Sequence, residues 1–222
     1  MVPDIDVFWS PARDVMALET HRGITHSFVG AVGLAVAIGL IVKLVGPEKR
    51  WPLLAGLSLL GIVIGHIFLD LITSYGIQLF LPFSNARPAW DLVFILDPFL
   101  TLPLLGALLA GYLWRPRAAI AGRVAFVWLA AYLAFMALSH FAAAATMDRV
   151  ARGRGIVPRR VEVLPAPFNP LRWRGFAEDE ENYWQGTVGL GRDLVDLVRI
   201  PKGPLNGPVA RAAQVGAVKT FL

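Results

Sequence analysis

Cysteine is absent from this chain of 222 residues, and charged residues make up only 17% of it. Without thiols the chain has neither disulfides nor thiolate metal sites, so nitrogen and oxygen must hold any metal ion. The low charge, with a mean hydropathy of +0.58, is unusual for a soluble domain. The net charge of +5 would suit nucleic acid, but the basic residues lie mainly in short loops and after the last apolar stretch. We therefore expect a membrane protein without direct nucleic-acid binding.

Four stretches of the sequence approach the length of a membrane-spanning helix, which needs about 20 apolar residues to cross about 30 Å of hydrocarbon. They are apolar on all sides, whereas helices of a soluble bundle keep a polar face. The stretches are residues 27–42, 51–69, 98–114 and 124–147. The sequence therefore predicts an all-α integral membrane core of about four transmembrane helices, embedded in a lipid bilayer.

The chain divides into a polar lead (residues 1–23), a membrane core (24–146) and an extramembrane tail (147–222). The tail has a turn-rich run at 164–170 and three segments with strand-like alternation or aromatic content. These segments are 160–163, 171–176 and 183–188, with a charged turn at 178–181. We predict a small β-containing C-terminal domain, and a short helix or loose end after Pro208.

Lysine and arginine in the short loops predict the orientation of the core. The loops after the first and third stretches each carry three basic residues, whereas the loop 73–90 carries only Arg87. The first two loops would then face the cytoplasm of a bacterial inner membrane, and the loop 73–90, the lead and the tail would face the periplasm. Five arginines early in the tail favour the opposite orientation.

Histidine and aspartate gather at the predicted periplasmic face. Some lie in the lead just before the first helix, and His66 and Asp70 share a helical face where the second helix leaves the bilayer. Asp97 is expected about two turns into a third helix that begins near Trp90. The candidate metal ligands are Asp4, Asp6, His21, His26, His66, Asp70 and Asp97.

These residue types in this setting favour a divalent metal. Ionisable groups inside a membrane helix are costly unless they are paired, hydrated or metal-bound. Imidazoles and carboxylates without sulfur suit Zn²⁺, Mn²⁺, Fe²⁺ or Mg²⁺, and the mixture of about four Asp and three His favours a site with more than one ion. Such an ion activates water for attack on a phosphoryl or acyl centre. Arg22 and Arg87 lie on the same face and are candidates to neutralise a phosphate.

Each signal also has a simpler interpretation. His66 and Asp70 can form a helical i,i+4 hydrogen bond, and the acids of the lead can be solvated. We leave Glu19 outside the ligand set as a solvated acid. His140 also stays outside, as a polar residue in helix packing.

Several phrases of the sequence resemble the YdjM/YbcI family of bacterial inner-membrane proteins. They are Pro3-Asp-Ile-Asp6, His21-Arg-Gly-Ile-Thr-His-Ser27, His66-Ile-Phe-Leu-Asp70 and Leu164-Pro-Ala-Pro-Phe-Asn-Pro170, with the resemblance running from residue 3 to residue 186. The family is described as metal-dependent hydrolases with distant similarity to zinc-dependent phospholipase C. This resemblance implies that the ligands named above hold zinc, with Asp97 as a ligand or its neighbour.

The sequence thus predicts a membrane-bound metal-dependent hydrolase that acts on a phosphoester or other ester, with a lipid as one candidate substrate. The alternative is a metal-stabilised membrane scaffold or partner-binding protein without catalysis. A small transporter is favoured less, because an ion path needs polar residues through the depth of several helices. The cytoplasmic halves of these helices have almost none.

Overall fold

The computed structural model describes residues 2–8, 22–46, 50–191 and 196–203. The described residues fall into two compact units, one up to Trp90 and the other from Asp91 to Gly203.

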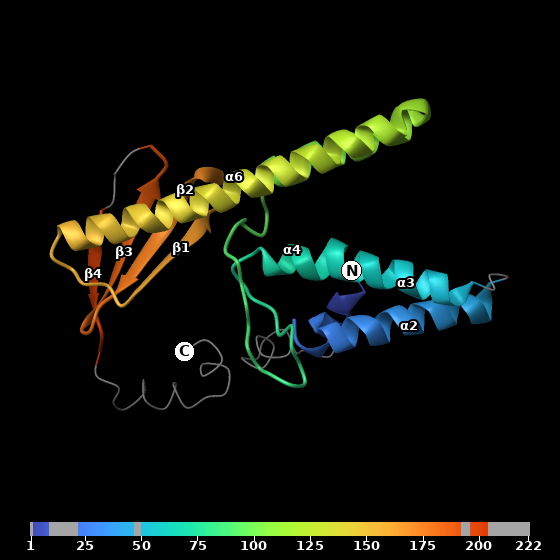
Figure 1. Cartoon of the computed structure of the whole chain (residues 1–222), viewed down its shortest axis with the longest axis horizontal. Helices are drawn as coiled ribbons and strands as arrows, with labels where there is room; N and C mark the ends of the chain where they lie inside the picture. Colours follow the sequence, from blue (N-terminus) through green and yellow to red (C-terminus); the bar gives the residue numbers. More distant parts are fainter. Residues whose placement is uncertain (1, 9–21, 47–49, 192–195, 204–222) are drawn as a thin grey trace. The chain divides into compact units, whose positions relative to one another are not determined.

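The first unit is built on a helical hairpin. Helix α2 (Phe28–Val45) runs antiparallel to α3 (Trp51–Ile62), which continues through the π-helical turn η3 (Val63–Ile67) into α4 (Phe68–Leu71) (Figure 1). Small residues let the two backbones approach closely. A Cβ at Gly39 would lie only 2.9 Å from the Cβ of Ala55. The buried core of this unit comprises Ala31, Ala35, Ile62, Ile67, Ile77 and Leu79.

Two short 3₁₀ segments and a loop cover one end of this hairpin. The segments are η1 (Pro3–Phe8) and η2 (Ile24–His26). Ser27 caps α2, because its Oγ accepts a hydrogen bond from the Gly30 N–H at 3.0 Å. A Cβ at position 30 would lie 1.8 Å from the Ile24 carbonyl oxygen, so this close approach requires glycine.

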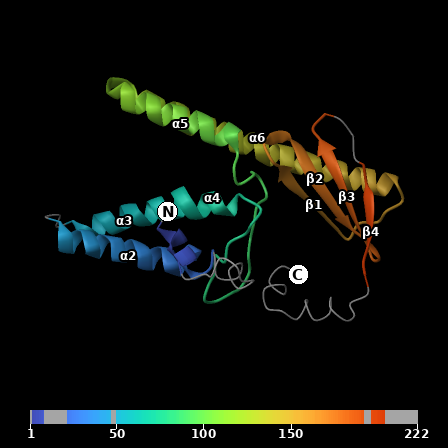
Figure 2. The same ribbon diagram turned by 180° about the vertical axis from the view of Figure 1, so that it is seen from behind.

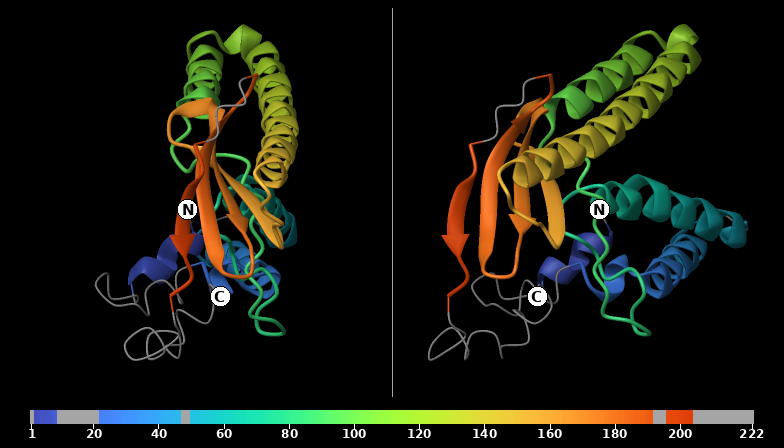
Figure 3. Two further views of the ribbon diagram at one scale, coloured as in Figure 1. Left: turned by 90° about the vertical axis from the view of Figure 1, so that its left-hand side faces the viewer. Right: turned by 60° about the vertical axis from the view of Figure 1, so that its left-hand side comes forward.

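The second unit contains a helix pair and a sheet. Helices α5 (Pro98–Leu113) and α6 (Ala118–Gly153) are joined by η4 (Arg115–Arg117) and lie side by side (Figure 3). The four-stranded antiparallel meander follows in the order β1-β2-β3-β4 (Figure 2). Its strands are β1 (Arg160–Ala166), β2 (Asn169–Glu178), β3 (Asn182–Gly189) and β4 (Val198–Pro201).

The sheet packs on the C-terminal half of α6. Trp173 on β2 is fully buried, and its ring contacts that of His140 with the centroids 5.5 Å apart. Gly175 allows the close approach, since a Cβ there would lie 2.8 Å from the Met147 Sδ. These contacts place His140 in helix–sheet packing within the second unit.

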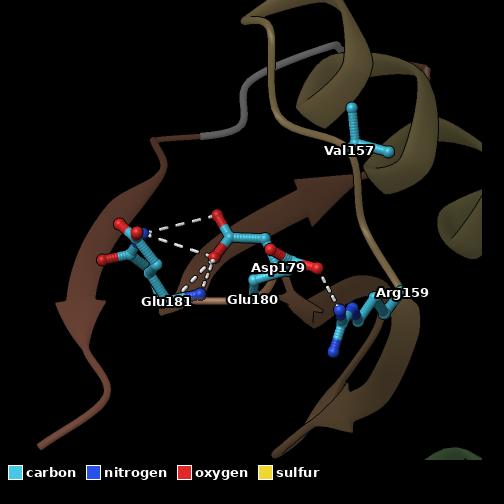
Figure 4. Close-up of a pocket in the computed structure, with 6 residues that line it drawn as sticks. Val157, Arg159, Asp179, Glu180 and Glu181 are labelled. Carbon is cyan, nitrogen blue, oxygen red and sulfur yellow. Dashed lines mark hydrogen bonds and ion pairs between the residues drawn. The ribbon is translucent and has the colours of Figure 1, made fainter.

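The charged turn between β2 and β3 is organised by Asp179 (Figure 4). Its carboxylate accepts hydrogen bonds from the Trp184 indole N–H at 2.7 Å and from the backbone N–H groups of Glu181 and Asn182. These hydrogen bonds, with that of Trp184 the largest cause, lower the pKa of Asp179 to about 2. Beside this turn, Arg159 forms an ion pair with Glu180.

The predicted fold class is confirmed. Among the described residues, three helical spans are long and apolar enough to cross a membrane, namely Phe28–Val45, Trp51–Leu71 and Arg115–Gly153, and α5 is a shorter apolar helix. The predicted β-containing tail is the four-stranded sheet.

Two helix boundaries and one strand differ from the prediction. The third helix begins at Pro98, after an irregular segment, and not near Trp90. The fourth helix continues past Met147 to Gly153, because Met147 and Ala151 are buried. Strand β4 was not predicted. The expected element after Pro208 lies outside the described residues.

Candidate metal centre

Two histidines face each other at the end of the α2–α3 hairpin. His26 ends η2, two residues before α2 begins, and its side chain is fully buried. His66 lies on the π-helical turn η3, a feature that is frequent at functional sites. Their Nε2 atoms are 3.1 Å apart. Residues 40 positions apart in sequence therefore present nitrogen donors to the same point.

Two carboxylates approach the same pair of nitrogens. Asp4 Oδ1 lies 3.5 Å from the His26 Nε2 and 3.3 Å from the His66 Nε2. Asp70 Oδ2 lies 3.4 Å and 3.5 Å from the same two atoms. Two donor triangles thus share the His26–His66 edge. Ligands at about 2.0–2.1 Å from a tetrahedral zinc ion are about 3.3–3.4 Å apart, close to these edges.

A second observation supports the fit of this donor set to a divalent cation. Within the described part of the chain, Asp70 Oδ2 is buried and has no hydrogen-bond partner, although it faces both histidines. An unsatisfied buried carboxylate oxygen is costly. A cation bound to the two nitrogens and this oxygen would remove that cost. The donor atoms of Asp4, His26 and His66 also all lie within 4.8 Å of one another.

Asp6 lies behind His26, on the other ring nitrogen. Its Oδ2 is 3.4 Å from the His26 Nδ1 and accepts hydrogen bonds from the Thr25 hydroxyl at 2.8 Å and the Arg22 backbone N–H at 3.1 Å. A carboxylate in this position orients a metal-binding histidine. Burial lowers the pKa of His26 below its usual value, against the opposing influence of Asp6 and Asp70. A lowered pKa favours the neutral imidazole, which is the form that binds metals.

Arg22 contacts the far side of Asp70. Its guanidinium lies 2.9 Å from Asp70 Oδ1, donates to the Thr73 hydroxyl at 3.3 Å, and stacks over the Tyr75 ring at 5.3 Å. These contacts orient the carboxylate so that Oδ2 points to the histidines. In this geometry the Arg22 guanidinium is buried against these protein groups. The phosphate-neutralising role considered for Arg22 stays a prediction.

Sequence reasoning assigned no role to Thr25, Thr73 or Tyr75. They lie in the phrases at residues 21–27 and 73–76 that resemble the YdjM/YbcI family, and Thr25 precedes His26 directly while the other two follow Asp70 within five residues. Hydroxyls beside metal ligands commonly support them.

The remaining candidates lie elsewhere or outside the described residues. His21 and Glu19 are outside them. Arg87 belongs to the loop of the first unit, where its carbonyl oxygen is 3.0 Å from the Cβ position of Gly76. Asp97 belongs to the second unit and caps α5: Oδ1 accepts from the Phe99 and Leu100 N–H groups, and Oδ2 accepts from the Tyr132 hydroxyl at 2.6 Å.

An apolar helical core with histidines and carboxylates gathered at one end of its first hairpin defines an integral membrane protein with a candidate metal centre. The chain belongs to the YdjM inner membrane protein family, whose model matches residues 1–144. That range includes the four donor residues and excludes the sheet.

A Bacillus subtilis protein described as uncharacterized protein YfhP is similar to part of the chain. The two are 33% identical over 110 residues, which make up 50% of this chain and 33% of that protein. The match therefore spans about a third of the relative's length. No solved structure matches the chain.

Proposed function

We propose that the chain is a membrane-bound metal-dependent hydrolase of phosphoesters that uses one divalent ion, most suitably zinc. The observation that carries the proposal is the pair of donor triangles with edges of 3.1–3.5 Å on His26 and His66. Membership of a membrane protein family agrees with the setting of the site. The hydrolytic chemistry is inferred from the donor set.

In this proposal His26, His66 and Asp4 hold the ion, and Asp70 supplies a fourth oxygen. A bound ion of this kind lowers the pKa of water towards 7 and supplies hydroxide for attack on phosphorus. Asp6 and the Thr25 hydroxyl oxygen, which lies 3.0 Å from the His26 Nδ1, keep the His26 ring in place. Arg22 holds Asp70 through Oδ1, which leaves Oδ2 directed at the histidines.

The solvent exposure of the four ligand side chains supports entry of a substrate from one side of the cluster. The side chain of Asp4 is 36% exposed, whereas those of His66 and Asp70 are 16% and 15% exposed and that of His26 is fully buried. A substrate would therefore enter past Asp4. Because the span Phe28–Val45 begins two residues after His26, this entrance lies at the membrane boundary, where lipid phosphoesters are found. The Lys/Arg bias of the loops favours the periplasmic side.

A second candidate function is a metal-stabilised scaffold. The fourth donor, Asp70 Oδ2, favours this alternative, since structural zinc sites are closed by four protein ligands whereas catalytic sites keep a position for water. In a scaffold the ion would tie η1 to the hairpin and have no turnover.

The test uses the full chain purified in detergent. Metal content is measured together with hydrolysis of a soluble phosphodiester and of phospholipid in mixed micelles. We expect close to one ion per chain and chelator-sensitive hydrolysis, both lost in the His66→Ala/Asp70→Ala double variant. Asp148→Ala is the matched control, because this acid lies on α6 and its carboxylate pairs with Arg152 one turn along the same helix. Metal without turnover would support the scaffold, and a metal-free native protein would contradict both functions.

A further inference from the structure

The loop that follows α4 carries two exposed aromatic side chains close to the candidate metal centre. Phe80 is 46% exposed and Phe83 is 86% exposed. They belong to one turn, because the backbone N–H groups of Phe83 and Ser84 donate to the Phe80 carbonyl oxygen at 2.9 and 3.1 Å. Large apolar side chains clustered on a loop indicate a contact surface.

Contacts with the start of α2 fix the position of this turn along the axis of the membrane-spanning hairpin. The Phe28 N–H donates to the Leu79 carbonyl oxygen at 3.1 Å, and Leu79 is buried in the core of the unit. The rings of Phe80 and Phe28 meet edge to face, with centroids 6.1 Å apart. Phe28 is the first residue of α2. Phe80 therefore lies level with the start of the first span.

The exposed rings continue the lipid-facing surface of α2. Phe28 and Val29 are about half exposed, and so is Val32 one turn further along the helix. Ile24, just before the helix, is 50% exposed. Since α2 is a membrane span, these side chains face lipid. At Phe28 this apolar surface continues without a polar break from the helix to the rings of Phe80 and Phe83.

Amphipathic aromatic residues mark the same level of the unit. Tyr75 and Trp90 are exposed, and Trp90 packs edge-on against Phe68 near the end of the second span. At the other end of the hairpin, the Lys43 ammonium lies 5.7 Å from the Trp51 ring. Aromatic rings of this kind typically lie at the two membrane–water interfaces.

We propose that Phe80 and Phe83 insert into the lipid bilayer at the boundary between headgroups and acyl chains, beside the start of α2. The loop 72–90 is then an interfacial membrane anchor and not a fully solvated connection. Its occupant is lipid, because the surface that it extends already faces lipid. The anchor holds the loop that contains Thr73, whose hydroxyl contacts both Arg22 and the backbone of Asp70, while Arg22 pairs with the Asp70 carboxylate.

Absence of cysteine allows a direct test with single-cysteine variants of the full chain in phosphatidylcholine/phosphatidylglycerol vesicles. A nitroxide is attached at Phe83→Cys and its collisions with oxygen and with a water-soluble nickel complex are compared. We expect collisions with oxygen to exceed those with nickel. Val36→Cys, on the exposed face of α2, is the bilayer reference, and Glu180→Cys, exposed on the charged turn between β2 and β3, is the aqueous reference.

A label at position 83 removes the phenyl ring, so a second measurement keeps it. A label at Ser84→Cys should shift towards water when Phe80→Ser and Phe83→Ser are added. A label at position 83 as nickel-accessible as the Glu180→Cys reference would overturn the proposal. Shielding from both oxygen and nickel would also overturn it, because a protein surface would then cover the rings. Neither readout depends on metal or turnover, so the proposed hydrolysis can fail or succeed independently.

Discussion

Asp6→Asn isolates the contribution of a residue that, in the proposed site, touches the ligand His26 without binding the ion itself. Asparagine has nearly the same shape, and its amide oxygen can still accept from the Thr25 hydroxyl or the Arg22 backbone N–H. It lacks the negative charge that lies 3.4 Å from the His26 Nδ1. The substitution should therefore keep the fold and weaken the orientation and basicity of His26.

The expected loss is about 10- to 100-fold in zinc affinity, the usual effect of removing a group that orients a ligand. This corresponds to about 1.4–2.7 kcal/mol of binding free energy. If Asp6 were itself a ligand, as the sequence alone suggested, the loss would be larger and close to that of His66→Ala. The distances favour the smaller effect, because Asp6 is placed on Nδ1 while Asp4 and Asp70 both approach the Nε2 atoms.

Zinc affinity is measured by competition with a chromophoric chelator in detergent, at one pH and with thermal unfolding recorded for every variant. Asp148→Asn serves as the charge-matched control and should bind zinc like the parent chain. An unchanged affinity in Asp6→Asn, with the fold intact, would refute the orienting role. A loss equal to that of His66→Ala would make Asp6 a ligand.

Three further predictions concern the rest of the fold. Gly39→Ala should destabilise the helical hairpin by about 1–3 kcal/mol, because its Cβ meets a neighbouring Cβ at 2.9 Å, whereas Gly33→Ala, with open space, should be tolerated in the same thermal scan. Asp97→Ala should cost about 0.5–2 kcal/mol in unfolding free energy through loss of the α5 cap and leave the metal content unchanged; loss of metal would return Asp97 to the ligand set. The pKa of Asp179 is lowered to about 2, so its stabilising effect is complete above about pH 4 and is lost as the pH falls towards 2. Asp179→Asn should remove that part of the acid dependence in a pH series of unfolding curves, and an unchanged series would contradict this assignment.

The membrane core was predictable because hydropathy is a property of consecutive residues. A helix that crosses hydrocarbon must be apolar over its whole length, so the first two spans begin within one residue of the apolar stretches in the sequence. The end of α6 was not predictable in this way, since the burial of Met147 and Ala151 depends on a sheet formed later in the chain. Strand β4 has only four exposed residues and no alternation of burial.

The histidine and aspartate residues of the site were predictable, and their roles were not. Composition and helix spacing brought His66 and Asp70 to one face, and the lead to the same end of the hairpin. Which nitrogen of His26 a carboxylate approaches depends on side-chain rotamers and on the positive φ of 62° at Arg22, which directs its N–H to Asp6. A residue pattern carries no signal for such details.

The contacts of Asp70 bear on the choice between hydrolase and scaffold. A structural site needs four permanent ligands, whereas a catalytic site needs one position that exchanges with water. The Arg22 guanidinium lies 2.9 Å from Asp70 Oδ1, so it orients the carboxylate whose Oδ2 faces the histidines. Within the part of the chain that the structure describes, the ion-pair contacts of Asp4 are with the two histidines and not with an arginine or lysine. Both carboxylates therefore face the same two nitrogens; hydrolysis would require one of their two positions to exchange with water, whereas a scaffold would require both to stay bound.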